Sequence, residues 1–112
     1  MNNFIKAMLK AGIIMKSESI GLRIYNHIKL NDEYKISIQC SAHHHCSPRR
    51  LTGIPHYDMY EVAFIHNEGG FCYPEKLIDF PRKQELDLCC EGTVFDYVPK
   101  DLVEDVYNYL KE

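Results

Sequence analysis

Proline and glycine are too scarce in this sequence for a disordered chain. The 112 residues include five prolines and six glycines, and they contain no internal repeat and no low-complexity segment. Hydrophobic residues make up 46% and charged residues 26%, which are ordinary values for a globular protein. A chain of this length can bury one continuous core but not two. We therefore expect a single folded domain over residues 1–112.

The sequence also has no long uninterrupted apolar run. The most apolar stretch near its start, residues 1–15, is broken by Lys6 and Lys10, so it resembles neither the core of a signal peptide nor a bilayer-spanning helix. Five cysteines, an odd number that includes the adjacent Cys89 and Cys90, are a poor basis for a disulfide framework. We therefore expect a soluble, cytoplasmic protein with reduced thiols and no membrane partner.

An overall positive charge is absent, although positive charge is concentrated locally. The formal net charge of −3 at pH 7 gives no support for binding to nucleic acid. Residues 1–50 hold eight Lys and Arg against three acids, or +5, whereas residues 51–112 hold five against thirteen, or −8. This asymmetry is compatible with a basic binding face, with an acidic binding face, or with attraction between the two parts of the chain.

Helical periodicity is present near both ends of the chain. The first apolar stripe follows Asn2 or Asn3, either of which is a suitable N-cap, and this helix is expected to end at Gly12 or at Ser17. Pro99 is suited to the first position of the second helix, because its missing N–H costs nothing there. The first stripe consists of Phe4, Ile5, Met8, Leu9 and Ile13, and the second of Leu102, Val103, Val106, Tyr109 and Leu110.

Strands are predicted between these two helices. Apolar and polar residues alternate clearly over residues 34–41, residues 59–66 are typical of a largely buried strand, and residues 93–97 favour a short one. Residues 20–30 favour strand over helix only weakly. Residues 43–57 contain two prolines and a glycine, which favours an irregular loop. The pattern predicts an α+β fold, in which a small antiparallel sheet is flanked by an N-terminal and a C-terminal helix.

The predicted loop carries a cluster of histidines and cysteines, CSAHHHCSPRR, at residues 40–50. Imidazole and thiolate together suit zinc. The ligands that we expect for such an ion are His44, Cys46, Cys40 and His56. In an extended segment His43 and His45 would lie on one face and His44 and Cys46 on the other, so they could not all reach one ion. Because no CxxC or HExxH motif is present, a zinc site would need further residues supplied by the fold.

The same loop is also suited to binding an anion, because guanidinium groups pair with phosphate or carboxylate through parallel hydrogen bonds. The residues that we expect at such a site are Arg49, Arg50, His43, His45 and Ser47. Alternatively, the arginines neutralise acids in the second half of the chain. A third chemistry, nucleophilic attack by Cys46 with His44 as the base, lacks an identifiable oxyanion hole. We therefore assign no catalytic residue.

Three segments resemble a group of small uncharacterised bacteriophage proteins: SIQCSAHHHCSPRR at residues 37–50, YEVAFI at 60–65 and GTVFDYVPKDLVEDV at 92–106. The resemblance covers residues 34–110, so residues 1–30 look like an N-terminal helical addition. It implies an accessory phage protein that acts on a host or defence factor in the host cytoplasm. Our leading hypothesis is thus a non-catalytic protein that has no cofactor and binds either a host or defence protein or a small anionic ligand. A homo-oligomer is compatible with this hypothesis. The alternative is a zinc-binding metalloprotein.

Overall fold

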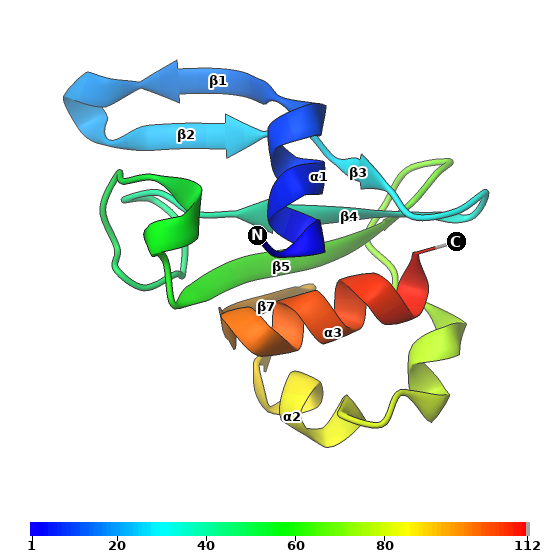
Figure 1. The fold of residues 1–112 in the computed structure, drawn as a ribbon. Helices are drawn as coiled ribbons and strands as arrows, with labels where there is room; N and C mark the ends of the chain where they lie inside the picture. The colour runs from blue at the N-terminus through cyan, green and yellow to red at the C-terminus, as the bar shows by residue number, and fades with distance from the viewer. Residues whose placement is uncertain (112) are drawn as a thin grey trace.

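The computed structural model describes residues 1–111, which form an α+β fold with antiparallel strand pairing (Figure 1). The larger sheet has the strand order β3-β4-β5-β7-β6, and β1 and β2 form a separate hairpin. In chain order the elements are α1 (Asn3–Ala11), β1 (Ile13–Ser17), η1 (Glu18–Ile20), β2 (Leu22–Tyr25), β3 (Ile28–Lys29), β4 (Tyr34–Gln39), η2 (Ile54–His56), β5 (Met59–His66), η3 (Glu75–Asp79), α2 (Lys83–Leu88), β6 (Cys90–Glu91), β7 (Val94–Pro99) and α3 (Lys100–Leu110). The predicted fold class, an antiparallel sheet flanked by the two terminal helices, is confirmed.

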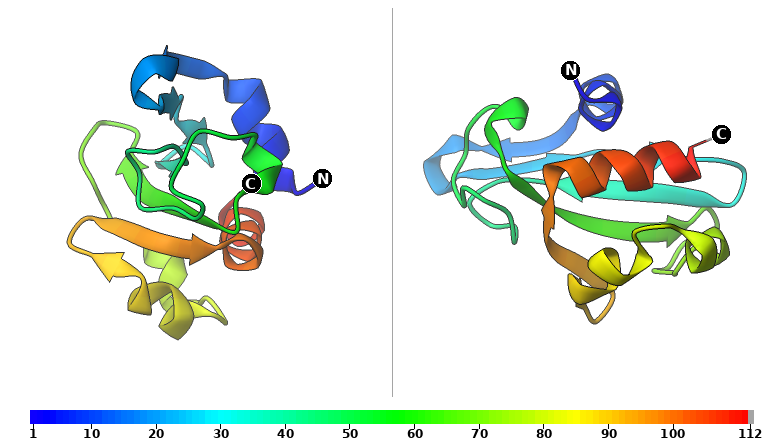
Figure 2. Two further views of the ribbon diagram at one scale, coloured as in Figure 1. Left: turned by 90° about the vertical axis from the view of Figure 1, so that its left-hand side faces the viewer. Right: turned by 60° about the horizontal axis from the view of Figure 1, so that its bottom comes forward.

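The two terminal helices lie over the same face of the five-stranded sheet (Figures 1 and 2). Side chains alternate across a strand, so every second residue of β4 and β5 faces these helices and the others face away. One buried cluster fills the space between the helices and the sheet. Its fully buried large side chains include Phe4, Ile5, Met8, Ile36, Ile38, Tyr60, Phe64 and Leu102.

Helix α1 is an integral part of this core. Phe4 is 0% exposed, and its ring packs edge-on against that of Tyr60 on β5, with 5.1 Å between ring centroids. The carboxylate of Glu104 on α3 accepts hydrogen bonds from the main-chain N–H groups of Asn3 and Phe4, at 2.8 and 3.0 Å. A carboxylate at this position satisfies free N–H groups and complements the positive end of the helix dipole. The first residues of the chain are thus tied to its last helix.

Helix α1 departs from the predicted details in two ways. Asn2 occupies the N-cap position, but its side chain makes no capping hydrogen bond, because Glu104 supplies that bond from a distant part of the chain. Leu9 and Ile13 belong to the predicted stripe but are exposed. The helix ends at Ala11, and Gly12 follows with φ of 83°, a left-handed conformation that glycine adopts readily. Of the two predicted ends, the one at Gly12 is confirmed.

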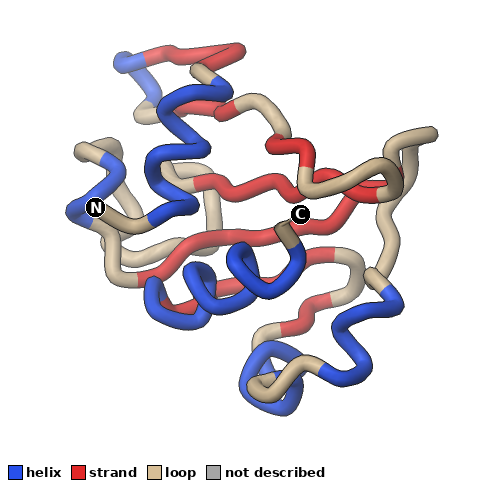
Figure 3. The backbone as a smooth tube through the Cα atoms, turned by 45° about the vertical axis from the view of Figure 1, so that its right-hand side comes forward, coloured by secondary structure: helices blue, strands red, loops and turns tan. Residues whose placement is uncertain are grey.

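The predicted strand at residues 20–30 is present as β2 and β3. The Gln39 side chain joins β2 to the main sheet, because its amide accepts from the N–H of Tyr25 and donates to the C=O of Tyr25, both at 2.8 Å. The side-chain amide of Gln39 thus makes the pair of hydrogen bonds with Tyr25 that the main chain of a neighbouring strand would make. Within residues 1–30 the helical segments are α1 and the short turn η1, and most of the rest is a hairpin (Figure 3).

Residues 82–92, which are charged and have no clear periodicity, contain the short helix α2 and the strand β6. Leu86 anchors the helix in the core, while Arg82 pairs with three carboxylates, those of Glu85, Asp101 and Asp105, at 2.7 to 3.0 Å. Pro99 ends β7 and occupies the N-cap position, so helix α3 begins one residue later than predicted. None of the helices in residues 1–111 combines the length and the apolarity that crossing a bilayer requires.

Candidate metal centre

Two buried tyrosines shape the long loop between β4 and β5. The hydroxyl of Tyr57 donates to the main-chain oxygen of Arg50 and accepts from the N–H of Thr52, and that of Tyr60 donates to the oxygen of Ile54 at 2.5 Å. Ser47 forms an isolated β-bridge with Met59 at the start of β5. The loop is therefore ordered by its own hydrogen bonds, as a buried backbone requires.

The three consecutive histidines lie on a tight turn and not on an extended segment. His43 bonds through Nε2 to the oxygen of Ile20 at 2.7 Å, and Nδ1 of His44 lies 2.7 Å from the hydroxyl of Ser41. Burial lowers the pKa of His44, which favours the neutral form of its imidazole. The alternation of faces predicted for residues 43–46 is wrong, because on this turn the three imidazoles point in different directions. His43 and His44 are engaged within the chain.

The thiols and the histidine that we expected to bind zinc are not grouped. Cys40 is fully buried, with Nη2 of Arg23 3.5 Å from its sulfur, and burial raises the pKa of Cys40 to about 12. Cys46 donates from Sγ to the main-chain oxygen of Ser41 at 3.2 Å, and burial raises its pKa as well. His56 is exposed on η2. Within residues 1–111 the structure does not gather His44, Cys46, Cys40 and His56 into one potential metal site.

The rate at which each thiol is alkylated should decrease with its burial. All five cysteines are free, and Cys90 is exposed whereas Cys40 and Cys46 are buried with raised pKa values. Because the thiolate is the reactive species, we expect iodoacetamide at pH 7.5 to modify Cys90 and to leave Cys40 and Cys46 intact until the protein is unfolded in urea. Peptide mass spectrometry measures this order. Modification of Cys46 in the native protein at the rate seen for Cys90 would contradict it.

The third histidine of the triplet lies in a different setting. Nδ1 of His45 is 2.9 Å from Oδ2 of Asp96 on β7 and 3.4 Å from Oε2 of Glu61 on β5, and ligand atoms of the three residues all lie within 4.8 Å of one another. The side chains of His45, Glu61 and Asp96 are 44%, 21% and 14% exposed. This group can hold a metal ion, and it remains open to solvent on the side of the imidazole.

The backbone places His45 between two strands. Its main-chain N–H donates to Oε2 of Glu61 at 3.1 Å, and its C=O accepts from the N–H of Tyr97 at 2.9 Å. The ring of Tyr97 lies beside the imidazole, with 5.8 Å between centroids. Since the peptide groups on both sides of the imidazole are anchored to neighbouring strands, the side chain starts from a defined position.

A β-bulge places two residues of β7, Asp96 and Tyr97, opposite Glu61 on β5. Tyr60 pairs with Val98 and Val62 with Phe95, so β7 takes three residue steps where β5 takes two. Both Phe95 and Val98 are buried in the core, and the residues between them, Asp96 and Tyr97, are more exposed. Tyr97 has φ of 52°, a left-handed conformation that costs a tyrosine on the order of 1 kcal/mol. Bulges of this kind often direct a side chain into a functional site.

The polar atoms of the group are poorly satisfied by the protein itself. Across residues 1–111, Nδ1 of His45 and Oδ1 of Asp96 are both buried without a hydrogen-bond partner. The 2.9 Å contact between Nδ1 and Oδ2 is close, but it does not have the angle of a hydrogen bond. Zinc bonds to N and O are about 2.0–2.2 Å long, so two tetrahedral ligand atoms are about 3.3 Å apart. The observed separations of 2.9 and 3.4 Å suit donor atoms around one cation.

The predicted anion site includes two arginines that the structure places on the surface. Arg49 and Arg50 are exposed, and neither guanidinium makes an ion pair with a carboxylate of residues 1–111. Of the sequence-predicted residues, only His45 belongs to the grouped set, and both of its partners were missed. Glu61 and Asp96 are lone acids within apolar strands, YEVAFI and TVFDYV, and that pattern is a signal that sequence reasoning can use.

No protein-family model, curated protein or solved structure matches this chain. The class of protein is therefore defined by the fold and the site alone. It is a small α+β protein with one His–Glu–Asp group at the end of its antiparallel sheet.

Proposed function

We propose that this protein binds one divalent metal ion, preferably zinc, through His45, Glu61 and Asp96. The observation that carries the proposal is the pair of buried polar atoms, Nδ1 of His45 and Oδ1 of Asp96, that make no hydrogen bond within residues 1–111, although Nδ1 lies 2.9 Å from Oδ2 of Asp96. Burying a polar group without a partner costs about 1–3 kcal/mol. A cation held between the imidazole and the two carboxylates would satisfy both atoms and neutralise the adjacent negative charges.

The donor set favours zinc over the other common divalent ions. Magnesium and calcium prefer oxygen ligands alone, whereas an imidazole nitrogen with carboxylate oxygens suits zinc. The thiols of Cys40 and Cys46 do not belong to this set, so the site differs from the cysteine-containing one that the loop sequence suggests. Three protein ligands leave a fourth position of tetrahedral zinc for water or for another molecule.

Isothermal titration calorimetry of the untagged, metal-free protein with zinc chloride tests this proposal. We expect one equivalent of zinc to bind, with much weaker binding of magnesium. His45→Ala is expected to weaken zinc binding at least a hundredfold, because it removes the only nitrogen ligand of the group.

The neighbouring histidine provides a matched control. His43→Ala removes an adjacent imidazole that is bonded to the main-chain oxygen of Ile20, so it should leave zinc affinity within about twofold. Equal losses in the two variants would show that zinc binds to the histidine run unspecifically. If the wild-type protein takes up no zinc, the three side chains form an ordinary ion pair of histidine with carboxylates and the proposal is wrong.

Binding of a host or defence protein stays a prediction from the phage resemblance. A lysine-lined cavity on another part of the surface favours the small anionic ligand of the same hypothesis.

A further inference from the structure

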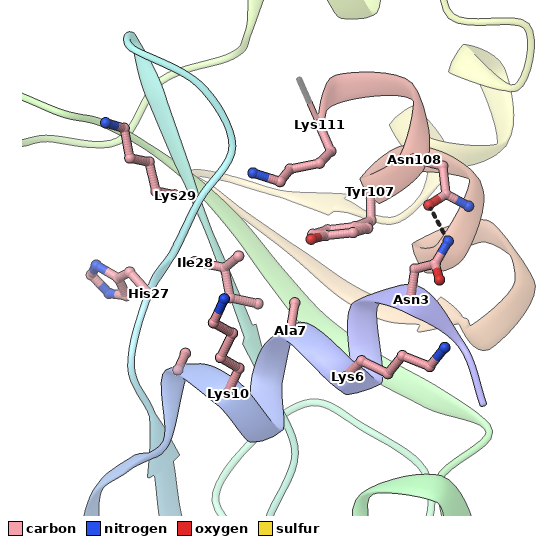
Figure 4. A pocket seen from close by; sticks show the side chains of 11 residues that line it. Asn3, Lys6, Ala7, Lys10, His27, Ile28, Lys29, Tyr107, Asn108 and Lys111 are labelled. Carbon is pink, nitrogen blue, oxygen red and sulfur yellow. Dashed lines mark hydrogen bonds between the residues drawn. The ribbon is translucent and has the colours of Figure 1, made fainter.

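A cavity of about 680 Å³ lies between α1, β3 and the C-terminal part of α3 (Figure 4). Its apolar lining comes from Ala7 and Ala11 on α1, Ile28 on β3 and Tyr107 on α3. This volume is within the range of about 300–1,000 Å³ that is typical of small-molecule sites. The cavity is at the junction of three elements, and it is separate from the His45 group in sequence and in its lining residues.

Four lysines line the same cavity, and no acid is among the described residues around it. They are Lys6, Lys10, Lys29 and Lys111. Lys10 and Lys111 extend from opposite helices toward the space over Ile28, whereas Lys6 and Lys29 extend away from Ile28 at the edges of the cavity (Figure 4). Like charges brought together in this way repel one another, and a bound anion relieves that repulsion.

Ion pairs within the chain do not account for these lysines. In the described part of the chain, Lys6 and Lys10 have no carboxylate partner, and Lys29 has only a long contact of 3.8 Å with the exposed Asp32. Four acids of the second half, Glu85, Asp87, Asp101 and Asp105, are paired instead with Arg82 and Lys83 of that same half. Attraction between the two halves, one of the explanations of the charge asymmetry, is therefore not realised through these lysines.

We propose that this cavity binds a small organic anion with two or more negative charges and an apolar body, of the chemical class of phosphate esters and polycarboxylates. The lysines contact the charged groups, and the apolar body rests on Ala7, Ile28 and Tyr107. Lysine binds phosphate and carboxylate as a point charge without a fixed geometry, which suits recognition by class. His27, whose pKa is lowered by burial and by Lys35, adds an imidazole at the rim.

Shape and charge favour a small anion over a nucleic acid. The basic residues surround a cavity of limited size and do not form a stripe along the surface, and the protein as a whole is negatively charged. A long polyanion would extend beyond the cavity and meet the acidic second half of the chain, whereas a small anion would not.

The test is a titration of the ¹⁵N-labelled full-length protein in metal-free buffer at about 0.15 M salt, followed by heteronuclear NMR. ATP is the probe with both charge and an apolar body, citrate is the polycarboxylate, and pyrophosphate supplies charge alone. We expect saturable shifts for amides of residues 6–11, 27–29 and 107–111, with ATP bound at least about fivefold more tightly than pyrophosphate. Metal-free buffer keeps the His45 group out of the experiment.

The double substitution Lys6→Gln and Lys10→Gln is expected to weaken ATP binding at least tenfold. Both lysines are exposed, so the variant should keep its fold, which a circular dichroism spectrum checks. Lys16→Gln, on β1 outside the cavity, is the matched control and should bind as the wild type does. Shifts confined to the loop of Arg49 and Arg50, equal affinity in the double variant, or saturable binding only to single-stranded DNA or anionic vesicles would each overturn the proposal.

Discussion

Replacing Phe4 by alanine is expected to destabilise the folded protein by about 3–5 kcal/mol, the usual cost of removing a fully buried phenylalanine. The ring is 0% exposed and packs edge-on against Tyr60, so its removal leaves a cavity between α1 and the sheet. Urea denaturation followed by circular dichroism measures the change. For a domain of this size, a loss of 3–5 kcal/mol is a large fraction of the total stability.

A second position on the same helix controls for effects on helix propensity. Leu9 is 54% exposed, and Leu9→Ala should change the free energy of unfolding by no more than about 0.5 kcal/mol. The comparison also tests whether residues 1–30 are an addition to an independent core, as the phage resemblance suggests. A loss below about 1 kcal/mol for Phe4→Ala would favour that view, whereas the expected loss makes α1 part of the core.

Zinc at a hundred times its dissociation constant is expected to stabilise the wild-type protein by about 2.7 kcal/mol, because it binds the folded state and the unfolded chain has no assembled site. Asp96→Asn should remove most of this stabilisation. The carboxamide has the shape of the carboxylate but lacks its charge, so it is a much weaker ligand for zinc. Chemical denaturation with and without zinc measures the difference.

The metal-free stability of the same variant separates a ligand from a structural residue. Asp96 lies beside a second carboxylate, Glu61, and its Oδ1 has no hydrogen-bond partner in the described chain, so Asp96→Asn should leave the metal-free protein at least as stable as before. Asp58→Asn, an exposed acid just before β5, is the control and should keep the full effect of zinc. A large loss of stability in Asp96→Asn without metal would contradict a ligand role and indicate that Asp96 supports the fold.

The elements of secondary structure were largely predictable because they depend on local patterns. Alternation identified β4 and β5, and the apolar stripe before the C-terminus identified α3, since these periodicities follow from the geometry of each element. The prediction was wrong where a distant residue decides the outcome. Glu104 caps α1 in place of Asn2 or Asn3, and Leu9 is exposed because no element covers that side of the helix.

The sequence by itself determined an α+β fold with an antiparallel sheet and two terminal helices. It also drew attention to His45, within a run of three histidines that nothing local distinguishes. Only the tertiary structure decided which imidazole lies beside the carboxylates, because Glu61 and Asp96 reach it from two neighbouring strands. The lysine-lined cavity likewise joins residues about a hundred positions apart, and side chains so distant in sequence are brought together only by packing.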